Sequence, residues 1–451
     1  MHSREEPGGP SRPLKAISQT FFREWITIAA ACLVALPALL LRVLDTGGIW
    51  HHDLPALAQA VIFGLGIFSA ATLLAWGSEV AETEISAGLA LVVLALIAVL
   101  PEYAVDLYFA IEAPHALECV TTAADGTMLP IGCVDPHPSH LAIANMTGGN
   151  RLLVGLAWPV IFLIFFLKTR KPSMPIVQGN ALGIMFLGAA TLYSFSIPLR
   201  GHLSLIDTGV MFGLFATYLF FASKSPPEED RVFVGPAAAI AALDRRARRI
   251  SIIAMFVYAA GVIFAAAEPF AESLVHTGKE AGIDEFILVQ WVAPLASESP
   301  EFILAGMIAA RGRYDAAMTI LISSKVNQWT LLIGSLPLAY SISGGTFSPL
   351  DFDARQSEEV FLTAAQSLFA VAILVSLTMD RWEALALAGL FLTQFFFTDT
   401  TIRVAYAGGY TVLAALILLR DIPSYGRFFR AARETAFHPR GQAGEARAPP
   451  G

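Results

Sequence analysis

Two proline–glutamate pairs lie inside long apolar stretches of the chain. The first is Pro101-Glu102, which ends a run of aliphatic residues, and the second is Pro300-Glu301. A carboxylate at membrane depth costs several kcal/mol unless it faces a partner, a cavity or an ion. Proline removes a backbone donor and opens the helix, which frees carbonyl oxygens beside the carboxylate. Oxygen ligands of these two kinds suit a cation, so we predict that both glutamates bind a metal ion or another cation.

Further polar side chains accompany each glutamate. Ser297 and Glu298 lie within one helical turn before Glu301, and we expect both to belong to the cation site. Asp106 lies one turn after Glu102 on the same helical face. It is either a residue of the site or its pathway, or a structural carboxylate. The structural alternative for the glutamates themselves is a helix cap or an ion pair with Arg or Lys.

The composition indicates that these residues lie in a membrane protein. Of the 451 residues, 55% are apolar, and the mean hydropathy is +0.62, whereas apolar residues usually make up about half of a soluble domain. Apolar stretches long enough to cross about 30 Å of hydrocarbon fall near 23–43, 56–76, 86–111, 141–167, 176–197, 203–222, 250–270, 284–310, 315–341, 358–378, 382–398 and 402–420. We therefore predict an all-α integral membrane protein with about 12 transmembrane helices.

The apolar stretches form two halves. We predict a cytoplasmic tail at 1–22, a first half at 23–222, a polar cytoplasmic linker at 223–249, a second half at 250–420 and a cytoplasmic tail at 421–451. The proline–glutamate pairs fall in the third and the eighth stretch, and this odd offset inverts the second half relative to the first. Inverted repeats with binding groups at corresponding positions are typical of secondary transporters.

Lys and Arg gather in both predicted tails and in the linker, which places these segments on the cytoplasmic side. We therefore expect a multi-pass protein of a bacterial-type plasma membrane with both termini in the cytoplasm. The long loop near 112–140 then lies outside. Its two cysteines, Cys119 and Cys133, are predicted to form a disulfide in that oxidising compartment.

Part of the second half resembles a known family. The segment Gly282-Ile283-Asp284-Glu285-Phe286, followed by Ala296-Ser297-Glu298-Ser299-Pro300-Glu301, resembles the second alpha-repeat of the calcium/cation antiporter superfamily. Its sodium/calcium exchangers have a Gly-Ile-Ser-Glu lead-in and a Gly-Thr-Ser-x-Pro-Glu core. Residues 88–102 resemble the first repeat more weakly. The resemblance implies alpha-repeats at 86–167 and 284–341, with the first and last helices as additions and Glu102 and Glu301 as the central carboxylates.

The resemblance also implies further ligands in the helix after each glutamate. In the second half, Ser324 falls where a hydroxyl ligand is expected and Gln328 where a second acidic or amide ligand is expected, with Asn327 beside it. In the first half, Asn150 or Arg151 occupies the matching position, and both alternatives stay open.

The chain departs from the family pattern at several positions. Lys325 stands where the turn usually has Asn, and Gln328 is neutral where many sodium/calcium exchangers have an acid. Lys325 is either a charge partner of Glu298 or Glu301, or it stands in for a bound cation in one transport state. Arg151 is a second possible charge partner. The identity and stoichiometry of the transported ions therefore stay open.

These features predict a secondary active cation antiporter, similar to a sodium/calcium exchanger, rather than an enzyme. We expect Na⁺ or Ca²⁺ to exchange against H⁺ or another cation by alternating access, because a buried carboxyl group can hold either a proton or a metal ion. The expected partners are membrane lipid and inorganic cations, with no nucleic acid and no resident cofactor. The alternatives are a passive cation channel, or a membrane sensor or scaffold that keeps the fold without transport.

Overall fold

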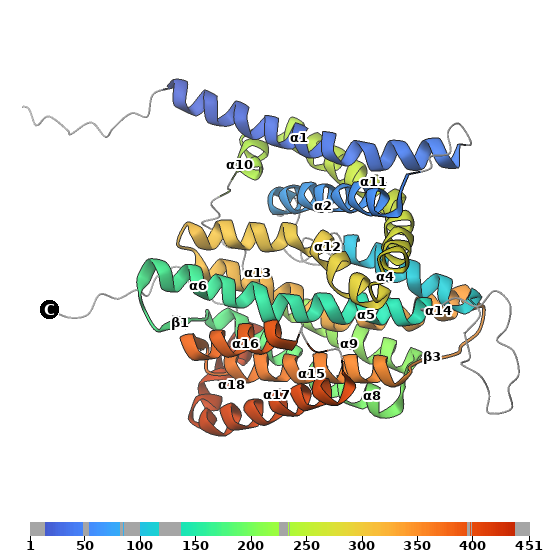
Figure 1. Cartoon of the computed structure of the whole chain (residues 1–451). Helices are drawn as coiled ribbons and strands as arrows, with labels where there is room; N and C mark the ends of the chain where they lie inside the picture. Colours follow the sequence, from blue (N-terminus) through green and yellow to red (C-terminus); the bar gives the residue numbers. More distant parts are fainter. Residues whose placement is uncertain are drawn as a thin grey trace, which may run out of the picture.

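The computed structural model describes residues 14–47, 54–81, 84, 100–116, 137–224, 233, 235–394, 397 and 399–437. Long, roughly parallel and antiparallel helices dominate this part of the chain (Figure 1). The helices up to the middle of the chain are α1 (Leu14–Thr46), α2 (Ala56–Ala81), α4 (Leu100–Glu112), α5 (Pro138–Leu152), α6 (Trp158–Thr169), α7 (Ala181–Ser194), α8 (Ser196–Arg200) and α9 (Leu205–Ala222).

The helices that follow are α10 (Pro236–Ala241), α11 (Arg245–Ala281), α12 (Glu285–Ala310), α13 (Tyr314–Asn327), α14 (Ile333–Gly344), α15 (Ala354–Leu374), α16 (Arg381–Gln394), α17 (Thr400–Arg420) and α18 (Tyr425–Phe437). Single 3₁₀ turns occur at η1 (Ala113–His115), η3 (Gln178–Asn180) and η5 (Ile422–Ser424). Two π-helical segments, η2 (Leu153–Ala157) and η4 (Gln328–Leu332), connect α5 to α6 and α13 to α14.

The helices have the length expected of a membrane protein. Within the described residues, eight are long and apolar enough to cross a bilayer: Phe22–Thr46, Ala56–Ala81, Pro138–Thr169, Gln178–Arg200, Leu205–Ala222, Arg245–Ala281, Ala354–Leu374 and Thr400–Arg420. The helical membrane class is thus confirmed, whereas the count of twelve spans and the inverted repeats stay predictions.

Four short strands are an addition to the predicted all-α fold. Strand β1 (Ser173–Pro175) pairs antiparallel with β4 (Thr378–Asp380), and β2 (His202–Leu203) pairs with β3 (Leu350–Asp351). Each has two or three residues and lies in a connection between helices. Strands this short leave no alternating pattern in the sequence, so the sequence analysis did not detect them.

The predicted tails and the linker also contain helices. Helix α10 lies within 223–249, and its Ala237 and Ile240 are buried against the first helices. Asp244 then caps α11 by accepting hydrogen bonds from the backbone of Arg246 and Ala247. In the C-terminal segment, α18 buries Phe428 and its alanines against the bundle. Short apolar runs inside these polar segments are the reason for both helices.

The described helices pack around two main hydrophobic cores, with two smaller apolar clusters beside them. We call α1, α2, α10 and α11 the N-terminal layer, because they share a core of their own. We call the remaining helices the main bundle, and they surround the larger core, which the inner faces of α2 and α11 also reach. Figure 1 shows the layer stacked on the bundle, with α12 and α4 at the junction.

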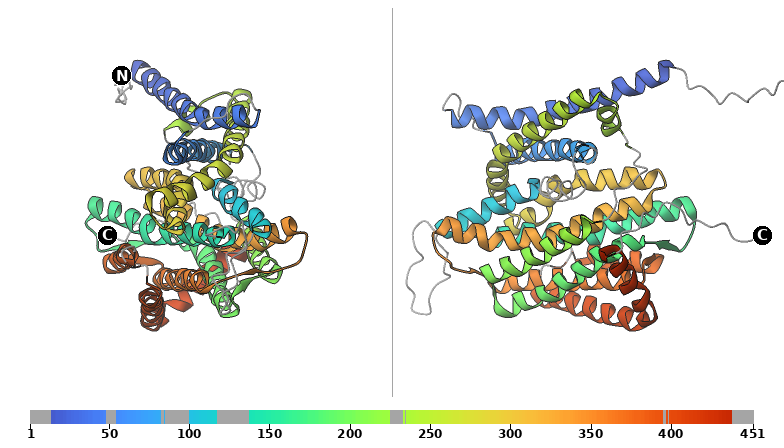
Figure 2. Two further views of the ribbon diagram at one scale, coloured as in Figure 1. Left: turned by 45° about the vertical axis from the view of Figure 1, so that its right-hand side comes forward. Right: turned by 180° about the vertical axis from the view of Figure 1, so that it is seen from behind.

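The start of the first described helix and the last described helix lie at the same end of the molecule, on opposite sides of the stack of helices. Helix α1 begins at the end where α18 lies, whereas α4 ends at the opposite end beside α14 (Figures 1 and 2). This arrangement agrees with an even number of crossings between α1 and α18.

Candidate cation site

Two consecutive glycines let α5 cross α12 at very short range. A Cβ atom on Gly148 would lie 1.8 Å from the backbone oxygen of Gln290, and one on Gly149 would lie 2.1 Å from Oε1 of Glu298. No larger residue fits at either position without a shift of the α12 backbone or of the Glu298 side chain. Small residues have this role at many close helix crossings in membranes. The crossing presses the Glu298 carboxyl group, midway along α12, against α5.

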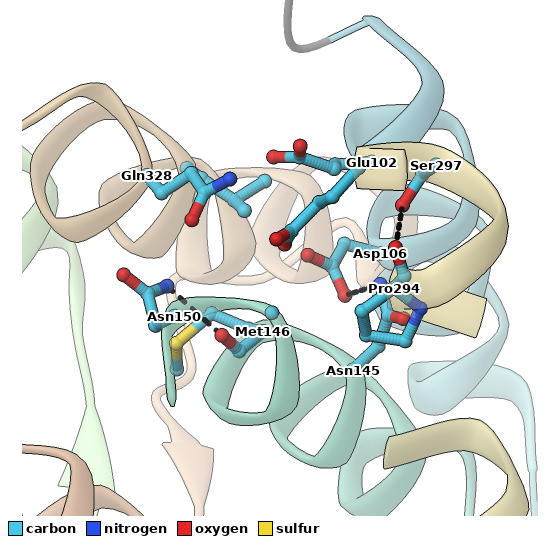
Figure 3. A pocket seen from close by; sticks show the side chains of 11 residues that line it. Glu102, Asp106, Asn145, Met146, Asn150, Pro294, Ser297 and Gln328 are labelled. Carbon is cyan, nitrogen blue, oxygen red and sulfur yellow. Dashed lines mark hydrogen bonds between the residues drawn. The ribbon is translucent and has the colours of Figure 1, made fainter. Parts of the chain in front are cut away.

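A narrow pocket lies at this crossing. Its lining comes from α4, α5, α12 and η4 (Figure 3). The lining residues are Glu102, Asp106, Asn145, Met146, Gly149, Asn150, Pro294, Ser297, Glu298, Gln328 and Leu332. The polar side chains among them are all buried. Segments far apart in the sequence thus place three carboxyl groups and several amide and hydroxyl oxygens around one small space.

Hydrogen bonds hold several of these side chains in place. Asn145 Nδ2 donates to Asp106 Oδ1 at 2.8 Å, and the Asn150 side chain donates to the backbone oxygen of Met146 at 2.9 Å. The hydroxyl of Ser297 donates to backbone oxygens one turn earlier on α12. Figure 3 shows these bonds around the pocket. These bonds leave the amide oxygen of Asn150 to accept from Lys325, and the second oxygen of Asp106 has no partner among the described residues.

Other oxygens in the pocket have no hydrogen-bond partner among the described residues. These are Glu102 Oε2, Asp106 Oδ2 and Glu298 Oε2, and the Gln328 amide is an electrostatic neighbour of Glu102 and Glu298. Leaving a buried polar group unpaired costs about 1–3 kcal/mol, and more for a charged one. The carboxyl group of Glu102 also experiences the charges of Glu298, Glu301 and Asp106. A bound cation or bound protons would relieve both the repulsion and the missing contacts.

A metal ion here would need neutral oxygen ligands as well as carboxylates. In the part of the chain that the structure describes, no three His, Cys, Asp or Glu side chains form a ready-made metal centre. Amide oxygens of Asn and Gln and hydroxyls of Ser are ligands that Ca²⁺ and Na⁺ accept. Asn150, Gln328 and Ser297 supply such groups at the pocket.

Glu301 lies beside the pocket and not in its lining. It is partly buried on α12, and its Oε2 accepts a hydrogen bond of 2.7 Å from the hydroxyl of Ser324 on α13. The structure therefore brings Glu298 together with Glu102, and it pairs Glu301 with Ser324. Asn327 is buried at the end of α13, next to Gln328.

Lys325 reaches from α13 to the edge of the pocket. Its Nζ donates to Asn150 Oδ1 at 2.7 Å and to the Asn150 backbone oxygen at 3.1 Å, and it lies 4.6 Å from the centroid of the Trp329 ring. Lys325 is 0% exposed, and its charge interacts with that of Glu298. Lys325 is thus a charge neighbour of Glu298 and a direct partner of Asn150.

Arg151 points away from the pocket into a separate charged cluster. It is buried, and it forms an ion pair of 2.6 Å with Glu359 on α15. Arg403 on α17 pairs with Glu359 and, at 2.9 Å, with Glu358. Of the two alternatives in the first half, Asn150 therefore lines the pocket and Arg151 does not. This cluster was not predicted from the sequence, although charged residues within the apolar stretches of α15 and α17 could have indicated buried ion pairs there.

A π-helical segment follows the polar turn in each half of the chain. Segment η2 begins shortly after Asn150 and Arg151, and η4 begins at Gln328. Such segments occur often at functional sites, because the extra residue in the turn changes where side chains point.

The two cysteines of the predicted disulfide, Cys119 and Cys133, lie outside the described residues.

Comparisons with known proteins show which proteins the chain resembles. A family model described as sodium/calcium exchanger protein matches residues 55–224 and 251–398. A crystal structure of the H⁺/Ca²⁺ exchanger CAX is 41% identical, has a TM-score of 0.82 and matches over 92% of this chain and 99% of that chain. A structure of the Ca²⁺/H⁺ antiporter protein YfkE is 15% identical, with a TM-score of 0.52 over 85% of this chain and 100% of that chain, and shows likeness of fold alone. A search of the curated proteins found no match.

Proposed function

Because the chain belongs to the sodium/calcium exchanger protein family, we propose that it exchanges Ca²⁺ for H⁺ across a membrane through the pocket between α4, α5, α12 and η4. Membership confirms the resemblance seen in the sequence, and with it the assignment as a multi-pass membrane antiporter of inorganic cations. Members of this family are transporters and not enzymes. The choice of Ca²⁺ and H⁺ is the step that we propose.

The observation that carries this proposal is the set of unpaired carboxyl oxygens at the pocket. Glu102, Asp106 and Glu298 each present an oxygen that has no partner within the described part of the chain. Several carboxylates offset a divalent ion better than a monovalent one, and Ca²⁺ takes carboxylate and amide oxygens as ligands. The same carboxyl groups can release Ca²⁺ by taking up protons. Competition for one set of oxygens then couples the two fluxes without a separate device. The likeness to the H⁺/Ca²⁺ exchanger CAX supports this choice of ions.

We propose that Glu301, Ser324 and Asn327 form the side of the site that faces α13. Glu301 lies one turn after Glu298 on the same helix and is held by Ser324. A short shift of α13 or α12 would bring its carboxylate to the pocket. In this scheme Glu102 and Glu301 keep the central roles that the family resemblance implies, and Glu298 adds a third carboxylate.

The proposed architecture is that of two inverted repeats, at 86–167 and 284–341, within about 12 transmembrane helices. Both termini lie in the cytoplasm, and Cys119 and Cys133 pair outside. The common end of α1 and α18 supports this topology. Alternating access would come from movement of the N-terminal layer against the main bundle.

Ion flux into proteoliposomes tests the proposed function. Purified protein is reconstituted, and Ca²⁺ uptake is measured under an imposed H⁺ gradient, an imposed Na⁺ gradient or neither. We expect Ca²⁺ uptake that requires the H⁺ gradient. Because protons leave the liposome as Ca²⁺ enters, the lumen should become more alkaline. The apparent affinity for Ca²⁺ should fall as protons compete, between about pH 8 and pH 5.5. Uptake that is independent of any counter-ion would indicate a channel, and Ca²⁺ binding without flux would indicate a sensor.

A further inference from the structure

Lys325 occupies an environment that would suit a free cation. Two oxygens of Asn150 accept hydrogen bonds from its ammonium group, at 2.7 and 3.1 Å. The face of Trp329 lies 4.6 Å from the nitrogen, and aromatic faces attract cations at this range. The negative charge of Glu298 acts on the same group. Oxygen ligands, an aromatic face and a carboxylate thus surround the end of a side chain that has no exposure to solvent.

The ammonium group uses ligands that the pocket would otherwise offer to an ion. Asn150 lines the pocket, and its amide nitrogen is already bound to Met146, which directs Oδ1 toward Lys325. Among the described residues, no Lys or Arg side chain lines the pocket itself, and Lys325 reaches it through its hydrogen bonds to Asn150. Lys325 is therefore the positive charge that the chain itself brings to this site.

The charges at the pocket indicate how many cations it takes up. Glu102, Asp106 and Glu298 contribute three negative charges when ionised, and the Lys325 ammonium group offsets one of them. Two negative charges then remain, which one divalent cation or two protons would neutralise. Without Lys325, the same pocket would have one negative charge more and two vacant oxygens on Asn150.

We propose that Lys325 is a tethered cation that permanently fills a monovalent-cation position beside the Ca²⁺ position. Lys325 thereby makes the exchanger independent of Na⁺ and determines how many ions move in each transport cycle. This inference rests on the proposed function, because it assumes that the pocket carries the transported ion. The further point is that the Lys325 ammonium group occupies oxygen ligands that a second, monovalent cation would otherwise use.

The test compares Lys325→Met with wild-type protein in proteoliposomes. Met removes the charge and keeps a similar length. Lys325→Arg keeps the charge, and Lys279→Met, at the exposed end of α11, is the matched control. Uptake of radioactive Ca²⁺ and Na⁺ is measured together, with the membrane potential clamped by K⁺ and valinomycin. For wild type and Lys279→Met we expect Ca²⁺ uptake without Na⁺ and without dependence on voltage, and Lys325→Arg should keep the same ion ratio at a lower rate because the guanidinium is larger.

For Lys325→Met we expect Ca²⁺ uptake to become dependent on Na⁺, with one Na⁺ moving with each Ca²⁺ and three H⁺ instead of two moving in return, so that exchange stays independent of voltage. An unchanged ion ratio in an active Lys325→Met protein would overturn the proposal. Wild-type protein that already moves Na⁺ with Ca²⁺ would overturn it too, whether or not any variant folds. Na⁺ binding to monodisperse Lys325→Met and Lys325→Gln in detergent gives a second readout, in which each variant should bind one Na⁺ more than wild type. Wild-type protein without any Ca²⁺ flux would instead contradict the proposed function itself.

Discussion

At the scale of single residues, the orientation of two glutamates on one helix decides what each can do. Glu298 and Glu301 lie three residues apart on α12, so their side chains leave neighbouring points of the helix surface. Glu298 contacts α5 at Gly149, and Glu301 accepts a hydrogen bond from Ser324 on α13. One turn of α12 thus presents the carboxyl group of Glu298 to α5 and that of Glu301 to α13. The pocket lies between Glu298 and Glu102.

We expect Glu102→Gln and Glu301→Gln to reduce exchange to about a tenth of the wild-type rate or less. The amide keeps the size of the side chain but loses the charge that holds a cation and the group that carries a proton. Loss of one contact with a charged partner costs about 1.5–3 kcal/mol, which corresponds to a ten- to hundredfold effect. The measurement is the initial rate of Ca²⁺ uptake into proteoliposomes at equal protein content.

Glu285→Gln is the matched control, because Glu285 lies in the first turn of α12, away from the pocket lining. It should exchange at nearly the wild-type rate. Size-exclusion profiles should show all three variants folded, since a neutral amide is cheaper to bury than a carboxylate. A near-normal rate for Glu301→Gln would mean that Glu301 has a structural role, with Glu298 in its place.

At the scale of elements, the crossing of α5 over α12 depends on residues without side chains. Gly148 meets the backbone of Gln290, and a backbone atom cannot move aside as the end of a flexible side chain can. The two helices therefore approach closely only while this position is glycine. Because Asn145 and Asn150 lie on the same helix, the crossing also sets where they stand relative to Glu298.

Gly148→Ala should destabilise the protein by about 1–3 kcal/mol, the usual cost of overpacking, and should impair exchange. The control is Gly209→Ala on α9, where an added Cβ meets nothing within 4 Å. That control should be neutral or slightly stabilising, because Ala favours helix more than Gly does. Thermal unfolding in detergent and Ca²⁺ uptake measure the two effects. Equal unfolding temperatures for the two variants would contradict the close crossing.

A second link between elements lies outside the predicted membrane spans. Glu84 binds Arg248 and, at 2.6 Å, Arg249 at the start of α11. Hydrogen bonds from Arg249 and Arg248 hold the pKa of the Glu84 carboxyl below its ordinary value. A carboxyl group whose pKa is lower in the folded state adds stability above its unfolded pKa, and this stability is lost as the pH falls through the folded pKa.

Glu84→Gln should therefore lower the unfolding temperature by about 1–3 °C at neutral pH, given the small worth of ion pairs near the surface. The difference between variant and wild type should shrink as the pH falls below the ordinary glutamate value of about 4.3 and through the lower pKa of folded Glu84. Thermal unfolding followed by tryptophan fluorescence at a series of pH values measures it. A difference that stays constant down to low pH would show that the ion pairs contribute nothing.

At the scale of the whole molecule, the two main cores distinguish the N-terminal layer from the main bundle, and we propose that the layer moves against the bundle. The N-terminal layer has its own core, and it meets the main bundle along α4 and α12, the helices that carry Glu102 and Glu298. Tyr108 on α4 donates a hydrogen bond of 3.1 Å to Glu272 on α11 across this junction. Movement of the layer would therefore open or close the path to the pocket.

A cross-link across the junction should stop exchange. In a cysteine-free background (Cys32→Ala, Cys119→Ala and Cys133→Ala), Tyr108→Cys and Glu272→Cys are joined by a short, reducible thiol reagent. We expect Ca²⁺ uptake to fall to the level of empty liposomes and to return after reduction, because the layer can no longer move against the bundle. Uptake before linking, after linking and after reduction measures it.

The control cross-link joins Arg42→Cys on α1 to Glu268→Cys on α11. These two residues form an ion pair within the N-terminal layer, so linking them leaves the junction free. Exchange should continue at its unlinked rate. Full activity of the linked Tyr108→Cys and Glu272→Cys protein would show that alternating access does not involve this movement.

The sequence by itself determined the class of protein and the candidates for its site. Long apolar stretches require a membrane, and polar residues inside them are too costly to be accidental. For this reason Glu102 and Glu298 could be selected without coordinates, whereas the family resemblance added Gln328 and gave Asn150 as one of two alternatives with Arg151. These four residues line the pocket, and Arg151 does not. Family membership also followed from local motifs, because the alpha-repeat pattern is contained within short segments.

Only the tertiary structure decided which of these residues meet. Asn150 and Lys325 lie far apart in the sequence, and so do Arg151 and Glu359, yet each pair is in contact. The rotation of each helix about its axis decides whether Asn150 or Arg151 faces the pocket, and packing against neighbouring helices sets that rotation. In lipid, packing depends on the fit of whole helix surfaces. A sequence pattern identifies the polar face of one helix, but it does not identify the helix that this face meets.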